Sequence, residues 1–217
     1  MNTYLLSIKE LKEASLDSEL YREALEKVDS SRREKVMRLT NDPKKVSLGA
    51  GLLLQYAVQE YELKNSQVVR CMQISEILNK LSQPQEFTYT YGQNGKPYFT
   101  NLPICFNLSH SGDYVLCVVS DTEVGAAIQQ MNDIDYWKTA ERFFQSEEIS
   151  MMRKLSTEAE QKRCFYRLWT RKEAYGKFTG DGVAKALSVD MADFPKGTMW
   201  EEYEIKDEYC IAICLKK

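Results

Sequence analysis

The sequence predicts an α+β protein in which each half of the chain runs from strands through a long helix to further strands. One long helix-like stretch begins at Asp42-Pro43 and continues to Leu63, and a second contains FYRLWTRKEAYGKF and ends at the glycines of TGDG. Short runs rich in β-branched and aromatic residues lie before and after both stretches. With 217 residues, of which 43% are hydrophobic, the chain can form one large domain or two small ones.

The charge balance and the cysteine usage narrow the class of protein. A net charge of −3 argues against a broad nucleic-acid-binding surface, and no apolar run approaches the length of a membrane span. The first residues, MNTYLLSIKELKEAS, do not resemble a signal peptide, because the apolar run is short and acidic residues follow it. The six cysteines include no CxxC pair, so we expect free thiols in a reducing cytoplasm, with neither zinc nor disulfides.

The pattern predicts the strands and helices in order. Strand-like runs occupy residues 3–8, 87–91, 106–108, 114–119, 123–130, 203–205 and 210–215. Helix-prone segments occupy residues 9–38, 42–63, 75–81, 135–155 and the segment from Phe165 to the TGDG glycines. In the helix that starts at Asp42, we expect Asp42 as the N-cap and Pro43 in the first turn. Gly49 and Gly51 each cost this helix about 1 kcal/mol relative to alanine, which indicates that another backbone packs closely there.

One stripe of the second long helix mixes aromatic and charged residues. Its members are four residues apart: Phe165, Trp169, Glu173 and Lys177. The aromatic members predict that the stripe faces inward, where a charge needs a partner or a role. The commonplace interpretation is an ordinary Glu–Lys pair, which stabilises a helix by about 0.2–0.5 kcal/mol.

Two polar segments are candidates for anion binding. In GQNGKPYF, Pro97 restricts the reach of Lys96 toward a phosphate or a base, although a plain surface hairpin explains the same residues. In NLSHSGD, Ser109 and the only histidine, His110, lie in a loop between two strands and can donate hydrogen bonds to a phosphate. A lone histidine between serines is more often structural, and no GxSxG elbow accompanies it.

The motifs, taken in order, resemble one enzyme family. GKPYF, FNLSHSGDY, VGxxI and LWTRKEAYGKFTGDG resemble the surfactin-synthetase type of 4′-phosphopantetheinyl transferase, and GAGLLL resembles the N-terminal helix of that family. The resemblance implies a duplicated fold of two similar lobes related by a pseudo-two-fold, each a small antiparallel sheet packed on a long helix. It implies an N-terminal lobe at 1–120, a C-terminal lobe with the metal and the catalytic helix at 121–217, and coenzyme A in the cleft between them.

The same resemblance implies a reaction and a set of site residues. The phosphopantetheine arm of coenzyme A passes to a serine of an apo acyl or peptidyl carrier protein, 3′,5′-ADP leaves, and Mg²⁺ holds the pyrophosphate. Glu173 is implied as metal ligand and base, and Lys177 as the group that stabilises phosphate charge or protonates the leaving group. The residues implied at the nucleotide end and its 3′-phosphate are Lys96, Pro97, Ser109, His110, Arg32, Lys35 and Lys45.

The metal site departs from the family pattern. The family strand usually reads Gly-x-Asp-x-Glu, whereas this chain has Ala127 and Gln129 at the two acidic positions. Alternate residues of a strand share a face, so both positions are expected to point toward the metal with Glu173. Ala127 offers no oxygen and Gln129 offers only a carbonyl, while Mg²⁺ demands hard oxygen ligands in near-octahedral geometry. We therefore expect weak metal binding and a rate loss of several orders of magnitude.

Three functions remain open from the sequence. The first is a cytoplasmic, monomeric enzyme of this family, with an impaired metal site and with no nucleic-acid or membrane partner. The second is a relative that binds coenzyme A or a carrier protein without efficient transfer, as Ala127 and Gln129 suggest. The third is a two-lobed α+β protein of unrelated function, in which a plain core strand explains VGAAIQQ.

Overall fold

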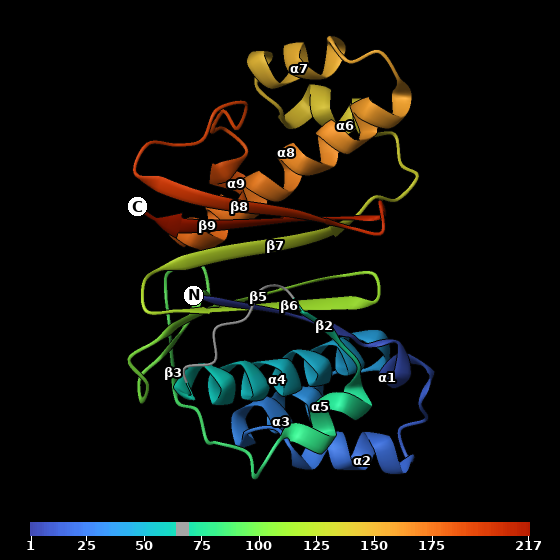
Figure 1. Ribbon diagram of the computed structural model, residues 1–217, viewed down its shortest axis with the longest axis vertical. Coiled ribbons are helices and arrows are strands. Elements are labelled where there is room, and N and C mark those ends of the chain that lie inside the picture. Colours follow the sequence, from blue (N-terminus) through green and yellow to red (C-terminus); the bar gives the residue numbers. More distant parts are fainter. Residues whose placement is uncertain (64–69) are drawn as a thin grey trace. The chain divides into compact units, whose positions relative to one another are not determined.

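A computed structural model describes residues 1–63 and 70–217. The chain divides into two compact units (Figure 1). Unit 1 contains Met1–Thr90 and Pro97–Asp121, and unit 2 contains Tyr91–Lys96 and Thr122–Lys217. Each unit has its own small sheet and its own helix of 22 residues, so the predicted α+β class is confirmed. The assignment of the chain to lobes 1–120 and 121–217 with separate roles stays a prediction.

The described residues up to Asp121 form the following elements. The strands are β1 (Asn2–Ser7), β2 (Arg70–Met72), β3 (Tyr89–Tyr91), β4 (Pro97–Phe99), β5 (Cys105–Ser111) and β6 (Tyr114–Ser120). The helices are α1 (Lys9–Glu13), α2 (Glu19–Glu26), α3 (Ser30–Arg38), α4 (Asn41–Glu62) and α5 (Ile74–Lys80). β3 pairs with β4, and the other strands form a sheet in the order β2-β1-β6-β5.

The sheet of unit 1 is antiparallel except at one edge. β1 pairs antiparallel with β6, as does β5, but β2 pairs parallel with β1. A parallel pair needs a long crossover, and helices α1 to α4 supply it between β1 and β2. This edge strand was not predicted, because three residues carry too short a pattern to distinguish a strand from a loop.

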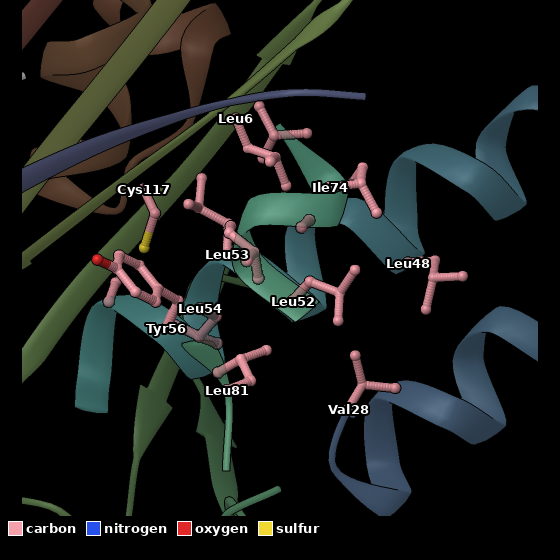
Figure 2. Close-up of a cluster of buried hydrophobic side chains, with 14 of the residues drawn as sticks. Leu6, Val28, Leu48, Leu52, Leu53, Leu54, Tyr56, Ile74, Leu81 and Cys117 are labelled. Carbon is pink, nitrogen blue, oxygen red and sulfur yellow. The ribbon is translucent and has the colours of Figure 1, made fainter. Parts of the chain in front are cut away.

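Helix α4 is the centre of the unit 1 core. Its consecutive residues Leu52, Leu53 and Leu54 are all fully buried, which means that the helix is covered on every side in this part. Figure 2 shows these leucines among side chains of β1, β6 and the neighbouring helices, with Leu6 and Cys117 on the sheet side. The continuous apolar run of the sequence therefore reflects a helix enclosed between a sheet and other helices.

The two glycines of α4 make room for side chains rather than for a backbone. A Cβ added at Gly49 would lie 2.5 Å from Cγ2 of Ile8, and one added at Gly51 would lie 2.5 Å from Cγ of Arg32. The prediction of a close backbone at these positions is therefore wrong. The aliphatic part of the Arg32 side chain packs against Gly51. This packing positions the Arg32 guanidinium beside α4.

From Val124 onward, the chain forms the elements of unit 2. The strands are β7 (Val124–Gln130), β8 (Thr198–Ile205) and β9 (Tyr209–Lys216). The helices are α6 (Tyr136–Phe143), α7 (Ser146–Arg153), α8 (Glu158–Thr179) and α9 (Val183–Ala186). The sheet has the order β7-β9-β8 and is antiparallel throughout.

The two units repeat one topology. In unit 1, β1 is followed by α4 and then by the β5–β6 hairpin, whose second strand pairs with β1. In unit 2, β7 is followed by α8 and then by the β8–β9 hairpin, whose second strand pairs with β7. The sequence halves show no visible repeat, so this similarity lies in the order and pairing of elements.

Helix α8 has well-defined ends and a close contact with β7. Thr157 and Glu160 form a capping box at its start, and Gly180, with φ of 73°, ends it in the left-handed conformation. A Cβ at Gly125 would lie only 2.1 Å from the carbonyl oxygen of Ala174. Only glycine allows the strand to approach the helix backbone this closely. The close approach places the rest of β7 against the stripe of α8.

Two local predictions near the candidate site are wrong. The N-cap of α4 is Thr40 rather than Asp42, because the helix begins at Asn41, ahead of the predicted start. Ser109 and His110 lie within β5, and the turn to β6 consists of Gly112 and Asp113. Hydrogen bonding to β6 extends β5 through residues that look polar and turn-like in the sequence.

In the described part of the chain, no helix is both long and apolar enough to cross a membrane.

Candidate functional site

The aromatic part of the α8 stripe is packed as predicted. Phe165 is buried, and its ring stacks on those of Phe144 and Trp169 at centroid distances of 5.2 and 6.0 Å. The indole Nε1 of Trp169 donates a hydrogen bond of 3.0 Å to Oε1 of Glu173. The stripe therefore turns from apolar to polar through tryptophan, whose ring packs in the core while its N–H holds the carboxylate.

Glu173 is also held from the facing strand. Nε2 of Gln129 donates to both carboxylate oxygens of Glu173 at 3.0 Å. Gln129 lies on the same face of β7 as Gly125, the residue that lets this strand approach α8. Residue 129 therefore faces Glu173, as strand parity predicts. The two side chains form a hydrogen bond between amide and carboxylate.

Lys177 lies one helical turn beyond Glu173. Its Nζ donates to the carbonyl oxygen of Ala126 at 3.0 Å. Burial lowers the pKa of Lys177 from 10.5 to about 8, and the charge of Glu173 opposes this shift. An amine with a pKa near 8 exchanges a proton readily at neutral pH, and its charged form can neutralise an oxyanion.

The residues at this place do not fit a magnesium ion. Ala127 is fully buried among the small side chains of Ala174, Ala212 and Cys214, and it contributes only a methyl group. The amide of Gln129 turns its N–H toward Glu173, so Glu173 is the one carboxylate of the implied ligand set. Within residues 1–63 and 70–217, no three His, Cys, Asp or Glu side chains come together as a metal-binding group. Mg²⁺ needs hard oxygen ligands, and the single carboxylate present, Glu173, already accepts hydrogen bonds from Gln129 and Trp169, so the protein's own donor set is too poor to hold it.

Lys96 is tied to oxygens of unit 2. Its side chain is nearly buried, and Nζ forms an ion pair with Glu123 and donates to the carbonyls of Val124 and Phe178 at 3.1 and 3.2 Å. Asn94, in the same loop, donates to the carbonyl of Gly180 at 2.8 Å. These bonds attach the Tyr91–Lys96 loop to the start of β7 and the end of α8. A role of Lys96 in nucleotide binding stays a prediction.

Unit 1 contains a pocket of about 680 Å³ that gathers most of the predicted nucleotide-binding residues. Five of the seven line it: Arg32, Lys35, Pro97, Ser109 and His110. They come from α3, β4 and β5, segments far apart in the sequence. Desolvation lowers the pKa of Lys35, and the charge of the neighbouring Arg32 acts in the same direction.

The first turns of α4 complete this pocket, and the sequence analysis missed them. The additional lining residues are Leu39, Asp42, Pro43, Val46, Ser47, Ala50 and Leu108. Oγ of Ser47 lies 3.5 Å from Nη1 of Arg32. The N-terminus of a long helix attracts anions, because its free N–H groups and its dipole present positive charge. The predicted helix start at Asp42-Pro43 was the one feature of the sequence that indicated an anion site at the first turns of α4.

Lys45 lies outside the pocket lining. Its Nζ donates to the carbonyl oxygens of Lys12 and Ala14, each at 2.7 Å. These acceptors end α1, so the ammonium caps the C-terminus of a neighbouring helix. The predicted role of Lys45 at a phosphate has no support from this position.

Comparison with known proteins agrees with the resemblance read from the motifs. Residues 121–214 match the family model described as the 4′-phosphopantetheinyl transferase superfamily. The match includes β7, α8 and β8, and with them Gln129, Glu173 and Lys177. The predicted resemblance to 4′-phosphopantetheinyl transferases is therefore confirmed.

Curated relatives carry the same enzyme name. The chain is 36% identical over 139 residues to the 4′-phosphopantetheinyl transferase psf-1 of Bacillus pumilus, covering 57% of this chain and 58% of the relative. It is 35% identical over 144 residues to the 4′-phosphopantetheinyl transferase HetI of a Nostoc species, covering 60% of each. It is 36% identical over 127 residues to AcpT of Salmonella typhimurium, covering 57% and 65%. The chain thus spans less than two thirds of the length of these relatives.

Proposed function

We propose that this chain, which carries a 4′-phosphopantetheinyl transferase superfamily domain at residues 121–214, transfers the phosphopantetheine arm of coenzyme A to a serine of an apo acyl or peptidyl carrier protein. The observation that carries the proposal is that the matched region contains Glu173 and Lys177 one turn apart on α8. The names of the relatives support the same activity.

The proposed reaction is a phosphoryl transfer with a balanced exchange of bonds. The serine oxygen forms a bond to the β-phosphorus of coenzyme A, the phosphoanhydride bond breaks, and 3′,5′-ADP leaves. Glu173, held by Trp169 and Gln129, accepts the serine proton. Lys177 neutralises the charge that develops on the leaving phosphate. Such a reaction needs mainly positioning and charge neutralisation, which these two side chains supply.

The unit 1 pocket is the proposed site for the nucleotide end of coenzyme A. Arg32 and Lys35 would pair with the 3′-phosphate, and the N-terminus of α4 would add its dipole. Ser109 and His110 on β5 would donate hydrogen bonds to the nucleotide. The proposal includes a cytoplasmic, monomeric protein. The six cysteines, all within the described residues, form no disulfide, which is compatible with a reducing compartment.

A second function has its own support in Ala127 and Gln129. The chain would then bind coenzyme A or a carrier protein without efficient transfer, because the positions that usually supply metal ligands are a methyl group and an amide. Calorimetric binding of coenzyme A together with the absence of transfer would favour this function.

Labelling of an apo carrier protein with a fluorescent coenzyme A conjugate separates the two functions. If the chain is a transferase, the wild-type protein labels the carrier, and Glu173→Gln lowers the rate by about 10²-fold or more, as expected for loss of a general base. Glu158→Gln, at the exposed start of the same helix, is the matched control and should leave the rate unchanged. The transferase proposal is rejected if neither the wild-type protein nor a folded Ala127→Asp variant labels the carrier.

A further inference from the structure

Both oxygens of Glu173 are engaged by side chains of the protein. Nε2 of Gln129 lies 3.0 Å from each oxygen, and Nε1 of Trp169 lies 3.0 Å from Oε1. Each contact is a donor meeting a carboxylate, so the orientation of Glu173 is set by hydrogen bonds from two different elements, β7 and α8. These three contacts occupy most of the roughly four acceptor positions of a carboxylate, which leaves little room for a cation on Glu173.

The neighbouring positions supply no replacement ligands. Ala127 is fully buried among Ala174, Ala212 and Cys214, so its side of the strand is packed with small apolar groups. The next residue of the stripe is Lys177, a cation whose Nζ bonds to the carbonyl of Ala126. This ammonium lies one helical turn from Glu173 and interacts with its charge, so it supplies one positive charge beside the carboxylate without a metal.

The local charge is therefore balanced without a metal. Glu173 and Lys177 sum to zero, whereas carboxylates at positions 127 and 129 would leave this place with a charge of −2. Two like charges about 4 Å apart repel by about 4 kcal/mol at an effective dielectric constant of about 20. A pyrophosphate can approach the existing pair without a dication to screen it, but it would be repelled by the acidic version.

We propose that coenzyme A binds this chain independently of divalent cations, because Gln129 and Trp169 hold Glu173 and because positions 127 and 129 carry no charge. The inference rests on the proposed function, since it concerns the same ligand. The inference differs from the proposed function in predicting that Lys177 alone binds the pyrophosphate. It also predicts that added metal does not change the affinity for coenzyme A.

The test is calorimetric titration of coenzyme A into the full chain, once with excess EDTA and once with millimolar Mg²⁺. The dissociation constants should agree within about two-fold, a difference of less than about 0.5 kcal/mol. Gln129→Glu should weaken binding by about ten-fold or more in EDTA, and Mg²⁺ should restore part of the loss. Ala127→Asp should act in the same direction, with Ala127→Asn as its matched neutral control for added bulk.

The outcomes separate the inference from the proposed function. If the wild-type chain binds coenzyme A more than about ten-fold more tightly with Mg²⁺, the inference is overturned while the proposed function stands. If coenzyme A binds in neither condition, both fall. If Gln129→Glu binds as tightly as the wild-type chain in EDTA, charge at position 129 does not control binding and the inference is overturned. Gln129 is half-buried rather than buried, so this variant tests the idea even where a change at the buried Ala127 prevents folding.

Discussion

Nζ of Lys172 lies 2.8 Å from Oε1 of Glu148, and both side chains are fully buried in unit 2. Glu148 also accepts the backbone N–H of Met191 at 2.7 Å, and Lys172 donates to the carbonyl of Val189 at 2.6 Å. The pair joins α7 and the segment after α9 to α8, at the residue directly before Glu173. It therefore supports the helix that carries both proposed catalytic side chains.

Lys172→Met should lower the free energy of unfolding by about 3–5 kcal/mol, because it leaves the carboxylate of Glu148 buried without its cation. Urea denaturation followed by circular dichroism measures the change. Lys162→Met is the control, since it removes an ion pair of 3.6 Å to an exposed Asp133 and should change stability by less than about 1 kcal/mol. Equal effects of the two substitutions would contradict a special contribution from the buried pair.

Gly125→Ala should destabilise unit 2 by about 1–3 kcal/mol or more, because the new Cβ would meet the backbone of α8 at 2.1 Å. A backbone in a helix cannot move aside as a side chain does. Gly51→Ala is the comparison: its Cβ would meet side chains, Cγ of Arg32 at 2.5 Å and Cγ1 of Val28 at 2.9 Å, which can shift more than a helix backbone can, and the helix gains about 1 kcal/mol in propensity. Melting temperatures of the two variants should therefore differ clearly, and a Gly125→Ala variant as stable as the wild type would refute the close packing of β7 on α8.

Lys177 should make stability rise with pH above about 8. Its pKa in the folded protein is about 8, lowered from 10.5 by burial, so between these values the unfolded chain binds more protons than the folded one. The free energy of unfolding then increases with pH, by at most about 1.4 kcal/mol per pH unit for one proton. Urea denaturation of the wild type and of Lys177→Met across pH 7 to 10 isolates this contribution. The rise should be smaller in the variant, where only the lowered pKa values of groups such as Lys35 and Lys172 remain, and parallel curves for the two proteins would contradict the lowered pKa of Lys177.

Arg32→Gln and Lys35→Gln should each weaken coenzyme A binding by about ten-fold or more, the value of one charge-assisted hydrogen bond. Dephospho-coenzyme A lacks the 3′-phosphate. If these cations bind that phosphate, it should bind the wild type and the two variants with similar affinity. Lys45→Gln is the control, because its ammonium caps α1 instead of lining the pocket. That variant should lose stability and keep its affinity, and a loss of affinity at Lys45 equal to that at Arg32 would place the phosphate elsewhere.

The sequence by itself predicted the two long helices, the strands longer than three residues, with β5 and β8 expected too short, and the face on which Glu173 and Gln129 meet. These follow from the periods of 3.6 and 2, which depend only on the order of residues along one element. It also determined that Ala127 brings no oxygen to the site, because that is a property of one side chain. The strands β2 and β4 and the helix α9 were not predicted, since so few residues carry little periodicity.

Only the tertiary structure decided which candidate residues come together. Arg32, Lys35 and His110 meet in one pocket, while Lys45 turns to α1 and Lys96 to Glu123, although the sequence offered all five as phosphate or nucleotide ligands. Tertiary structure also showed that Gly51 makes room for a side chain and Gly125 for a backbone. The physical reason is that a residue's partner is set by packing between distant segments, whereas its local conformation is set by its neighbours along the chain.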